Sequence, residues 1–255
     1  MNLLKADFYH LLKDKVFYVL LTITLLLPFV TCFMSPEMAV DKSIFHSIDT
    51  TFICSIVGIM VALFVGKDYA NNTIRNKICY GEKRYKIMSV AFIESAIICL
   101  IFFVASFLSA FIFGSIFGEF TFAAGFVPKI LCQLAILLAF STVVAAITIC
   151  SKSVKIGLIV TLMISILLSS LSQMLPMLAV TNGVAAFFCR IIYATVSGNM
   201  LNSVDGTYIY TAYTQSGAAS ITFGHLYLNS IILAVVYILI AVGVTAVVVK
   251  KQSYK

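Results

Sequence analysis

The sequence predicts an all-α integral membrane protein, a single transmembrane domain over residues 1–255 with six transmembrane helices. Hydrophobic residues make up 62% of the chain and charged residues only 11%, whereas soluble domains are about half apolar and about a quarter charged. Long apolar segments recur along the chain, and the segments between them carry most of the Lys and Arg residues. A soluble fold of this composition would expose large apolar patches, so the bilayer is the expected solvent.

The first predicted element is an amphipathic helix over residues 2–15. Its charged residues, Asp7 among them, are expected to fall largely on the face opposite the apolar ones. This pattern predicts a helix that lies in the membrane interface. A plain helical extension of the first span is the alternative. The apolar positions are Leu4, Phe8, Leu11 and Leu12.

Six apolar segments are then predicted to span roughly 30 Å of hydrocarbon as helices. They cover residues 16–34, 48–66, 87–118, 130–150, 156–180 and 226–249. Pro28 is expected to kink the first, because a proline inside a helix removes a backbone hydrogen bond. The third carries small residues four apart, which allow a helix of this chain or of a second chain to approach closely. These are Ser106, Ala110, Gly114 and Gly118.

Positive charge gives the orientation of the spans. Of the 17 Lys and Arg residues, only Lys42, Lys129 and Arg190 fall on one side, and the other 14 fall on the side that holds both termini. Cytoplasmic loops carry the excess of Lys and Arg. Both termini and the loop over residues 67–86 are therefore predicted to be cytoplasmic.

The longest outer loop covers residues 181–225. Its residues 184–196 are apolar except for Arg190 but too few to cross a bilayer, which predicts an interfacial or re-entrant segment. Residues 197–224 are rich in Ser, Gly, Thr, Asn and Tyr.

Sequence signatures of catalysis are missing from the chain. It has no H-E-x-x-H, no G-x-S-x-G and no G-x-x-x-x-G-K-[ST] phosphate loop. No catalytic residue is therefore predicted, and the chain is not expected to hydrolyse nucleotide. The seven cysteines form no C-x-x-C pair, so neither a metal site nor a disulfide framework is expected. The net charge of +7 fits the positive-inside bias, and no nucleic-acid partner is expected.

Glu94 is the charged residue of the third predicted span. Ionisable groups in a membrane are costly and are candidates for function. Glu94 follows Lys86 by eight residues, about 12 Å along a helix, so it is expected just inside the interface. It is a candidate intramembrane polar site. The alternatives are a carboxyl that is protonated, snorkels to the interface or bonds a neighbouring helix.

The basic loop between the second and third spans shows internal order. Asp68 is expected to cap a short helix over residues 68–80, and Gly81 to end that helix in a left-handed turn. Such a helix, parallel to the membrane, can pass force from a cytoplasmic motor to two spans at once. The alternative is a solvated loop held by anionic lipids.

The run FVGKDYANNTIRNKICYGEKRYKIMSV resembles the conserved loop of ABC-2-type transporter permeases. That loop shows an acidic residue, a Gly-Thr pair, a short helix, a glycine and an arginine before the third span. Asp68 stands in the acidic position, where Glu is commoner, and Asn72 with Thr73 replaces Gly-Thr. Gly81 and Arg84 match the helix end and the basic re-entry. The resemblance extends to chain length and to the six-span pattern.

The resemblance implies the membrane subunit of an ATP-driven exporter in a bacterial cell membrane. It implies a second permease chain, identical or homologous, and two cytoplasmic ATPase subunits that hold the ATP and Mg²⁺, with no cofactor in this chain. The implied cargo is hydrophobic or amphipathic, such as an antimicrobial peptide, a drug or a lipid. A motorless transporter or channel, and a membrane scaffold or sensor, are the alternatives. The implied ATPase-coupling residues are Asp68, Tyr69, Asn71, Asn72, Thr73, Arg75, Asn76, Gly81 and Arg84.

Overall fold

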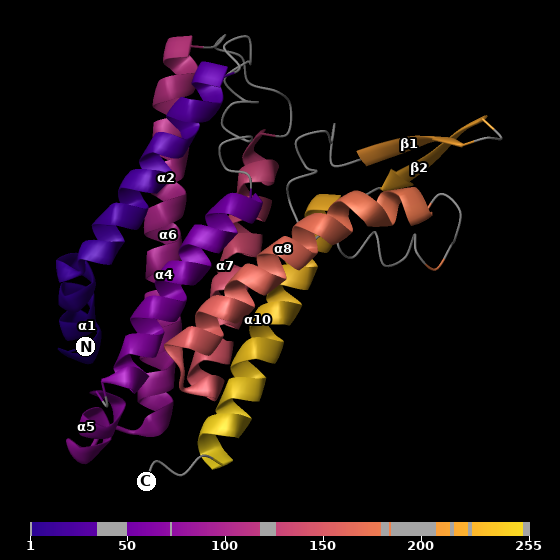
Figure 1. The fold of residues 1–255 in the computed structure, drawn as a ribbon. Coiled ribbons are helices and arrows are strands. Elements are labelled where there is room, and N and C mark those ends of the chain that lie inside the picture. Colours follow the sequence, from indigo (N-terminus) through magenta and orange to yellow (C-terminus); the bar gives the residue numbers. More distant parts are fainter. Residues whose placement is uncertain are drawn as a thin grey trace.

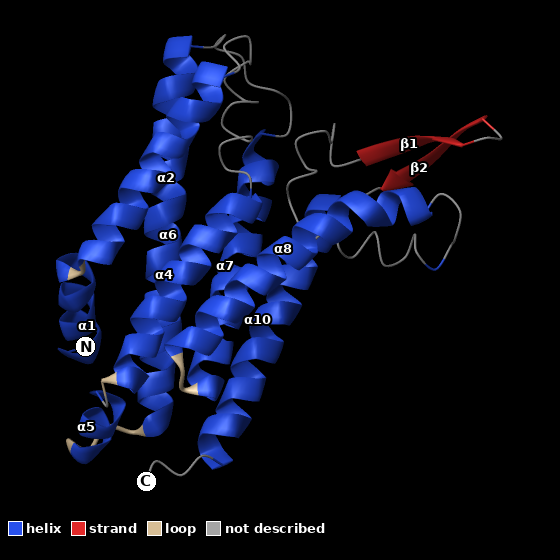
Figure 2. Cartoon of the chain, viewed as in Figure 1, coloured by secondary structure: helices blue, strands red, loops and turns tan. Residues whose placement is uncertain are grey.

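In the computed structural model, the described part of the chain is a bundle of long helices with one small sheet (Figure 1, Figure 2). The prediction for residues 184–196, apart from Val184, and the candidate residue Asn72 lie outside the described part. The described residues are 2–34, 50–71, 73–117, 126–179, 184, 208–214, 217–223 and 226–251.

The helices lie close to the predicted segments. They are α1 (Asn2–Lys13), α2 (Lys15–Met34), α4 (Thr50–Ala70), α5 (Thr73–Cys79), α6 (Arg84–Phe117), α7 (Phe126–Ser151), α8 (Val154–Ala179) and α10 (Leu226–Lys251). Among the described residues, four helices (α4, α6, α7 and α10) are long and apolar enough to cross a membrane, and α2 and α8 contribute shorter apolar helices. These helices support an integral membrane protein, as the composition predicts.

The centre of the bundle is α4, which packs against α2, α6, α7 and α8. Its side chains Val57, Met60 and Val61 are fully buried. At Gly66 the backbone of α8 comes so close that an added Cβ would lie 2.9 Å from the Cα of Val154. Glycine on α4 therefore permits the close approach of these two helices.

The small-residue stripe of α6 packs within this chain. Ser106 and Ala110 are buried, and Gly114 is buried as well. The neighbouring helix α2 contacts α6, where the rings of Phe29 and Phe113 meet edge to face at 5.3 Å between centroids. Close packing inside the chain thus accounts for the described part of the stripe, while Gly118 lies outside it.

The predicted outer loop over residues 181–225 contains a β-hairpin, so the all-α prediction is wrong here. Strands β1 (Tyr208–Thr214) and β2 (Gly217–Phe223) pair antiparallel, from Tyr208 opposite Phe223 to Thr214 opposite Gly217. Aromatic and β-branched residues are frequent in both strands, and such residues favour pleated structure. The Ser, Gly and Thr content of the region concealed this signal.

The two ends of the bundle carry different secondary-structure elements. Helices α1 and α5 and the last turn of α10 lie at one end, and the hairpin lies at the other (Figure 1). The first and the last described helices, α1 and α10, thus bring their outer ends to the side of α5.

Candidate functional site

The connector between α4 and α6 holds a separate short helix, but that helix does not start where the sequence predicted. Helix α4 continues to Ala70 and α5 begins at Thr73, so Asp68 lies in the last turn of α4 and does not cap α5. The backbone hydrogen bond from Asn71 N–H to the Lys67 carbonyl, 2.9 Å, still follows the helical pattern. The reason is local: the sequence has no helix-breaking residue between Gly66 and Asn71.

The predicted end of the short helix is confirmed. Gly81 has a φ of +87°, a left-handed conformation that glycine adopts without a steric penalty. Its N–H donates to the Ile78 carbonyl at 2.9 Å, and the Glu82 N–H donates to the Lys77 carbonyl at 3.2 Å. This pair of bonds is a Schellman motif, which satisfies the last carbonyl groups of α5 and turns the chain toward α6.

One face of α5 is buried against the bundle. Ile74 is buried, and Lys77 and Ile78 are half-buried. Because these positions are three and four residues apart, they lie on one side of the helix. Ile74 and Ile78 line a small cavity together with Val249 of α10. The inner face of α5 is thus apolar around a single lysine.

The opposite face of α5 is exposed. Arg75, Asn76 and Cys79 are exposed, and Tyr80, just after the helix, has 89% of its surface accessible. An arginine and a tyrosine are side chains that protein interfaces favour. The outer face therefore offers hydrogen-bond donors and an aromatic ring to a partner.

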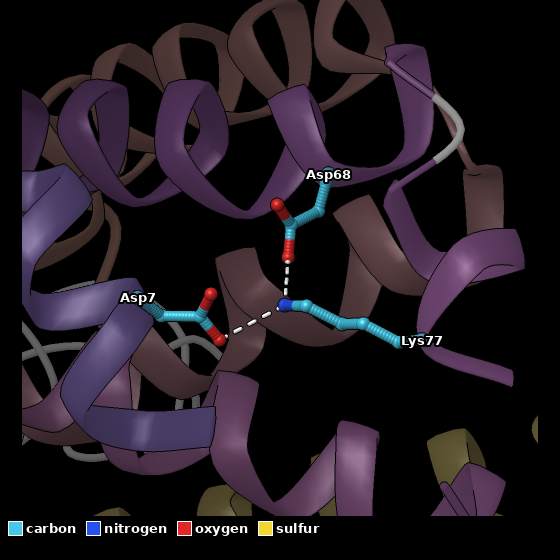
Figure 3. Close-up of polar contacts among 3 residues, drawn as sticks. All are labelled: Asp7, Asp68 and Lys77. Atoms are coloured by element: carbon cyan, nitrogen blue, oxygen red, sulfur yellow. Dashed lines mark hydrogen bonds and ion pairs between the residues drawn. The ribbon is translucent and has the colours of Figure 1, made fainter. Parts of the chain in front are cut away.

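Lys77 joins three helices (Figure 3). Its Nζ donates to Oδ2 of Asp7 in α1 at 2.9 Å and to Oδ2 of Asp68 in α4 at 2.7 Å. Burial disfavours the charged form of Lys77, but the hydrogen bonds to Asp68 and Asp7 outweigh burial, and the pKa of Lys77 is raised above its ordinary value. Lys77 therefore stays an ammonium ion at neutral pH and holds α5 against α1 and α4.

Glu94 of α6 belongs to the same site. It is buried and lines a small cavity with Asp7, Asp68 and Lys77. We call these four residues the polar cluster. The structure thus brings together two residues that the sequence singled out separately, Asp68 and Glu94, and places both beneath α5.

The sequence reasoning missed Asp7 and Lys77. It assigned Asp7 to the polar face of the first helix, but Asp7 is only 7% exposed and lies on the buried side with Leu11. Its spacing of four residues from Leu11 was the available signal. Lys77 was one of six basic residues in the loop, and its place between Ile74 and Ile78 was the signal.

The other predicted coupling residues are spread around the connector. Tyr69 is half-buried and lines the cavity beside Ile74 with Arg84, and Thr73 is half-buried at the start of α5. Those that are exposed are Asn71, Arg75, Asn76, Gly81 and Arg84.

A second polar contact lies beside the polar cluster. Asp14 separates α1 from α2, and its Oδ1 accepts a hydrogen bond from the Val16 N–H at 3.1 Å, as a helix N-cap does. The other oxygen of Asp14 forms an ion pair with Lys67 of α4. The break between α1 and α2 is therefore fixed to the end of α4, and α1 is a separate helix, not an extension of the first span.

Comparison with known proteins identifies no family for this chain: no family model matches it, and no curated protein matches it. Among the described residues, no group of three or more His, Cys, Asp or Glu side chains is placed to hold a metal ion. What the site can do chemically is hold charge. It fixes an ammonium ion between two carboxylates and buries a third carboxyl beside them.

Proposed function

We propose that this chain is the membrane subunit of an ATP-driven exporter, with α5 as the helix that a cytoplasmic ATPase moves. The observation that carries the proposal is the two-sided character of α5. Its inner face is bonded through Lys77 to α1 and α4, while its outer face exposes Arg75, Asn76 and Tyr80. A helix held on one side and open on the other is suited to receive force from a partner.

The connections of α5 give that force a route into the membrane. Helix α5 lies in the chain between α4 and α6, two of the four described helices that are long enough to cross a bilayer. Through Asp7 it is also bonded to α1, which precedes α2 directly. A displacement of α5 would therefore act on three apolar helices together.

The proposed assembly follows the resemblance of the connector to ABC-2-type permeases. In it α2 and α8 complete six spans, both termini are cytoplasmic, and the membrane is a bacterial cell membrane. Two ATPase subunits supply ATP and Mg²⁺, and a second permease chain completes the path. The proposed cargo is hydrophobic or amphipathic, such as an antimicrobial peptide, a drug or a lipid.

The test is purification of the tagged full-length chain from its own host in mild detergent, with identification of the proteins that remain bound. We expect an ATPase with nucleotide-binding motifs in near-equal amount. The variant Arg75→Glu reverses a charge on the outer face of α5 and is expected to lose this ATPase. Lys83→Glu makes the same reversal at an exposed residue outside α5 and is the matched control.

Two results would reject the proposal. One is a chain that purifies intact and without an ATPase, which would favour a motorless transporter or a scaffold. The other is equal ATPase binding by Arg75→Glu and the unaltered chain. Asp68 is not a suitable target for this test, because its carboxylate points inward to Lys77 and its loss would disturb packing as well.

A further inference from the structure

The polar cluster holds more acidic groups than its one cation can satisfy. Asp7, Asp68 and Glu94 supply three carboxyl groups, and among the described residues Lys77 is the only cation that lines their cavity. Both bonds of Lys77 go to the two aspartates. Full ionisation would leave the cluster with a net charge of −2 in a largely buried place, which is costly because the low-polarity surroundings do not screen charge.

Glu94 is the group left without a counter-charge. It is 7% exposed, and its Oε1 has no hydrogen-bond partner. Its carboxyl lines the same small cavity as that of Asp7. Two carboxyl groups in one buried cavity can bond each other only if one of them carries a proton, because an ionised carboxylate is an acceptor alone.

We propose that the polar cluster is a proton-binding site, in which Glu94 holds a proton at neutral pH and faces Asp7 across the cavity. The proton brings the net charge of the cluster from −2 to −1 and allows the Glu94 carboxyl to donate a hydrogen bond instead of repelling its neighbour. The inference concerns α1 and α6 and does not depend on whether α5 binds an ATPase.

The size and chemistry of the cavity favour a proton over another cation. Its volume is about 10 Å³, at the lower limit for a single water molecule. A metal ion would need several oxygen ligands around it, and the described residues form no such group. A proton needs only the two facing carboxyl groups.

The charged groups around the pair come from three helices besides α6. Helix α1 contributes Asp7 itself and His10, which acts electrostatically on Asp68. Helix α4 contributes Asp68, and α5 contributes Lys77. Among the described residues, no side chain of α2, α7 or α10 lines the cavity. Loss of the proton would leave Asp7 and Glu94 ionised and facing each other, so it would push α1 away from α6.

The test is a pH titration of the full-length chain by infrared spectroscopy, with glutamate labelled with ¹³C at its side-chain carboxyl. A protonated carboxyl shows a C=O stretch that a carboxylate lacks, and the label separates glutamate from aspartate. We expect a labelled C=O band at pH 7 that is lost in Glu94→Gln. Glu82→Gln, which removes a carboxylate paired with Lys86, is the matched control and should keep the band.

The variant Asp7→Asn tests whether Asp7 acts on the proton of Glu94. It removes the facing negative charge and supplies an amide donor, so Glu94 should ionise more readily. The midpoint of the band should fall by about one pH unit or more, a tenfold lower proton affinity. The proposal is overturned if the unaltered chain has no labelled band at pH 7, if the band survives Glu94→Gln, or if Asp7→Asn leaves the midpoint in place. The unaltered chain and Asp7→Asn decide the question even if Glu94→Gln does not fold.

Discussion

Replacement of Lys77 by methionine tests whether one ammonium ion holds the α5 end of the bundle together. The substitution keeps much of the side-chain length and removes the charge. It breaks the bonds to Asp7 and Asp68, 2.9 and 2.7 Å long. Loss of one partner from a buried ion pair costs about 3–5 kcal/mol. Because the side chain of Asp68 is 31% exposed, we expect the lower value, about 3 kcal/mol, or roughly 6–12 °C in Tm.

The chain provides its own reporter for this measurement. It has no tryptophan, but Cys54, Cys99 and Cys132 are buried and become reactive on unfolding. A fluorogenic maleimide in mild detergent therefore follows thermal unfolding. Cys79 is exposed and would react in the folded state, so all variants should carry Cys79→Ser.

Lys86→Met is the matched control for Lys77→Met. Lys86 pairs with Glu82 on the surface, and its side chain is 50% exposed. Such surface pairs contribute less than about 1 kcal/mol, so its Tm should change by no more than a few degrees. If Lys77→Met unfolds at the same temperature as this control, the ammonium ion does not hold α5 against α1 and α4.

Three further predictions concern the same Tm; the two glycine variants use the maleimide assay, and the pH series is read by far-ultraviolet circular dichroism, because maleimides hydrolyse in alkali. Gly81→Ala should cost about 1–2 kcal/mol, because its φ of +87° is left-handed; no loss of Tm would contradict the turn. Gly66→Ala should lower the free energy of unfolding by about 1–3 kcal/mol, because the new Cβ would meet the backbone of Val154. The control Gly243→Ala places its Cβ in open space and should raise the free energy of unfolding by up to about 1 kcal/mol. Equal effects of the two variants would contradict the close packing at Gly66. The pKa of Lys77 is raised in the folded chain, so its contribution to stability is complete below the unfolded pKa of 10.5 and is lost as pH rises through the higher folded value. The Tm difference between the unaltered chain and Lys77→Met should therefore begin to shrink only above about pH 10.5.

The long apolar helices were predictable because a bilayer imposes a length and a polarity on any helix that crosses it. The end of α5 was predictable because Gly81 signals a left-handed turn by its residue type alone. The start of α5 was not, since the sequence shows polarity changing after Gly66 but does not show that α4 continues through Lys67 and Asp68. Outside the apolar segments, local propensity and tertiary contacts determine where a helix begins and ends.

The polar cluster likewise could be predicted only in part from the sequence. Asp68 and Glu94 drew notice because of their residue types and positions in the sequence. Their partners did not, because the bond from Lys77 to Asp7 joins residues 70 apart, and sequence spacing on one helix says nothing about the helix it meets. A charged residue on an apolar face, as Asp7 is beside Leu11, is the observation that predicts such a partner before the structure is known.

The lysine on the inner face of α5 is informative because an apolar contact that replaced Lys77, Asp7 and Asp68 together would attach the helix at least as firmly. Buried ion pairs are often less stabilising than well-packed hydrophobic side chains. A lysine bonded to two helices differs in one respect: it can lose one carboxylate and remain paired with the other. On this interpretation Asp7→Asn and Asp68→Asn each lower the free energy of unfolding only slightly, and the double variant lowers it by more than the sum of the two single losses. Additive losses in the double-mutant cycle would show two independent bonds and would contradict the interpretation that either carboxylate alone can hold Lys77.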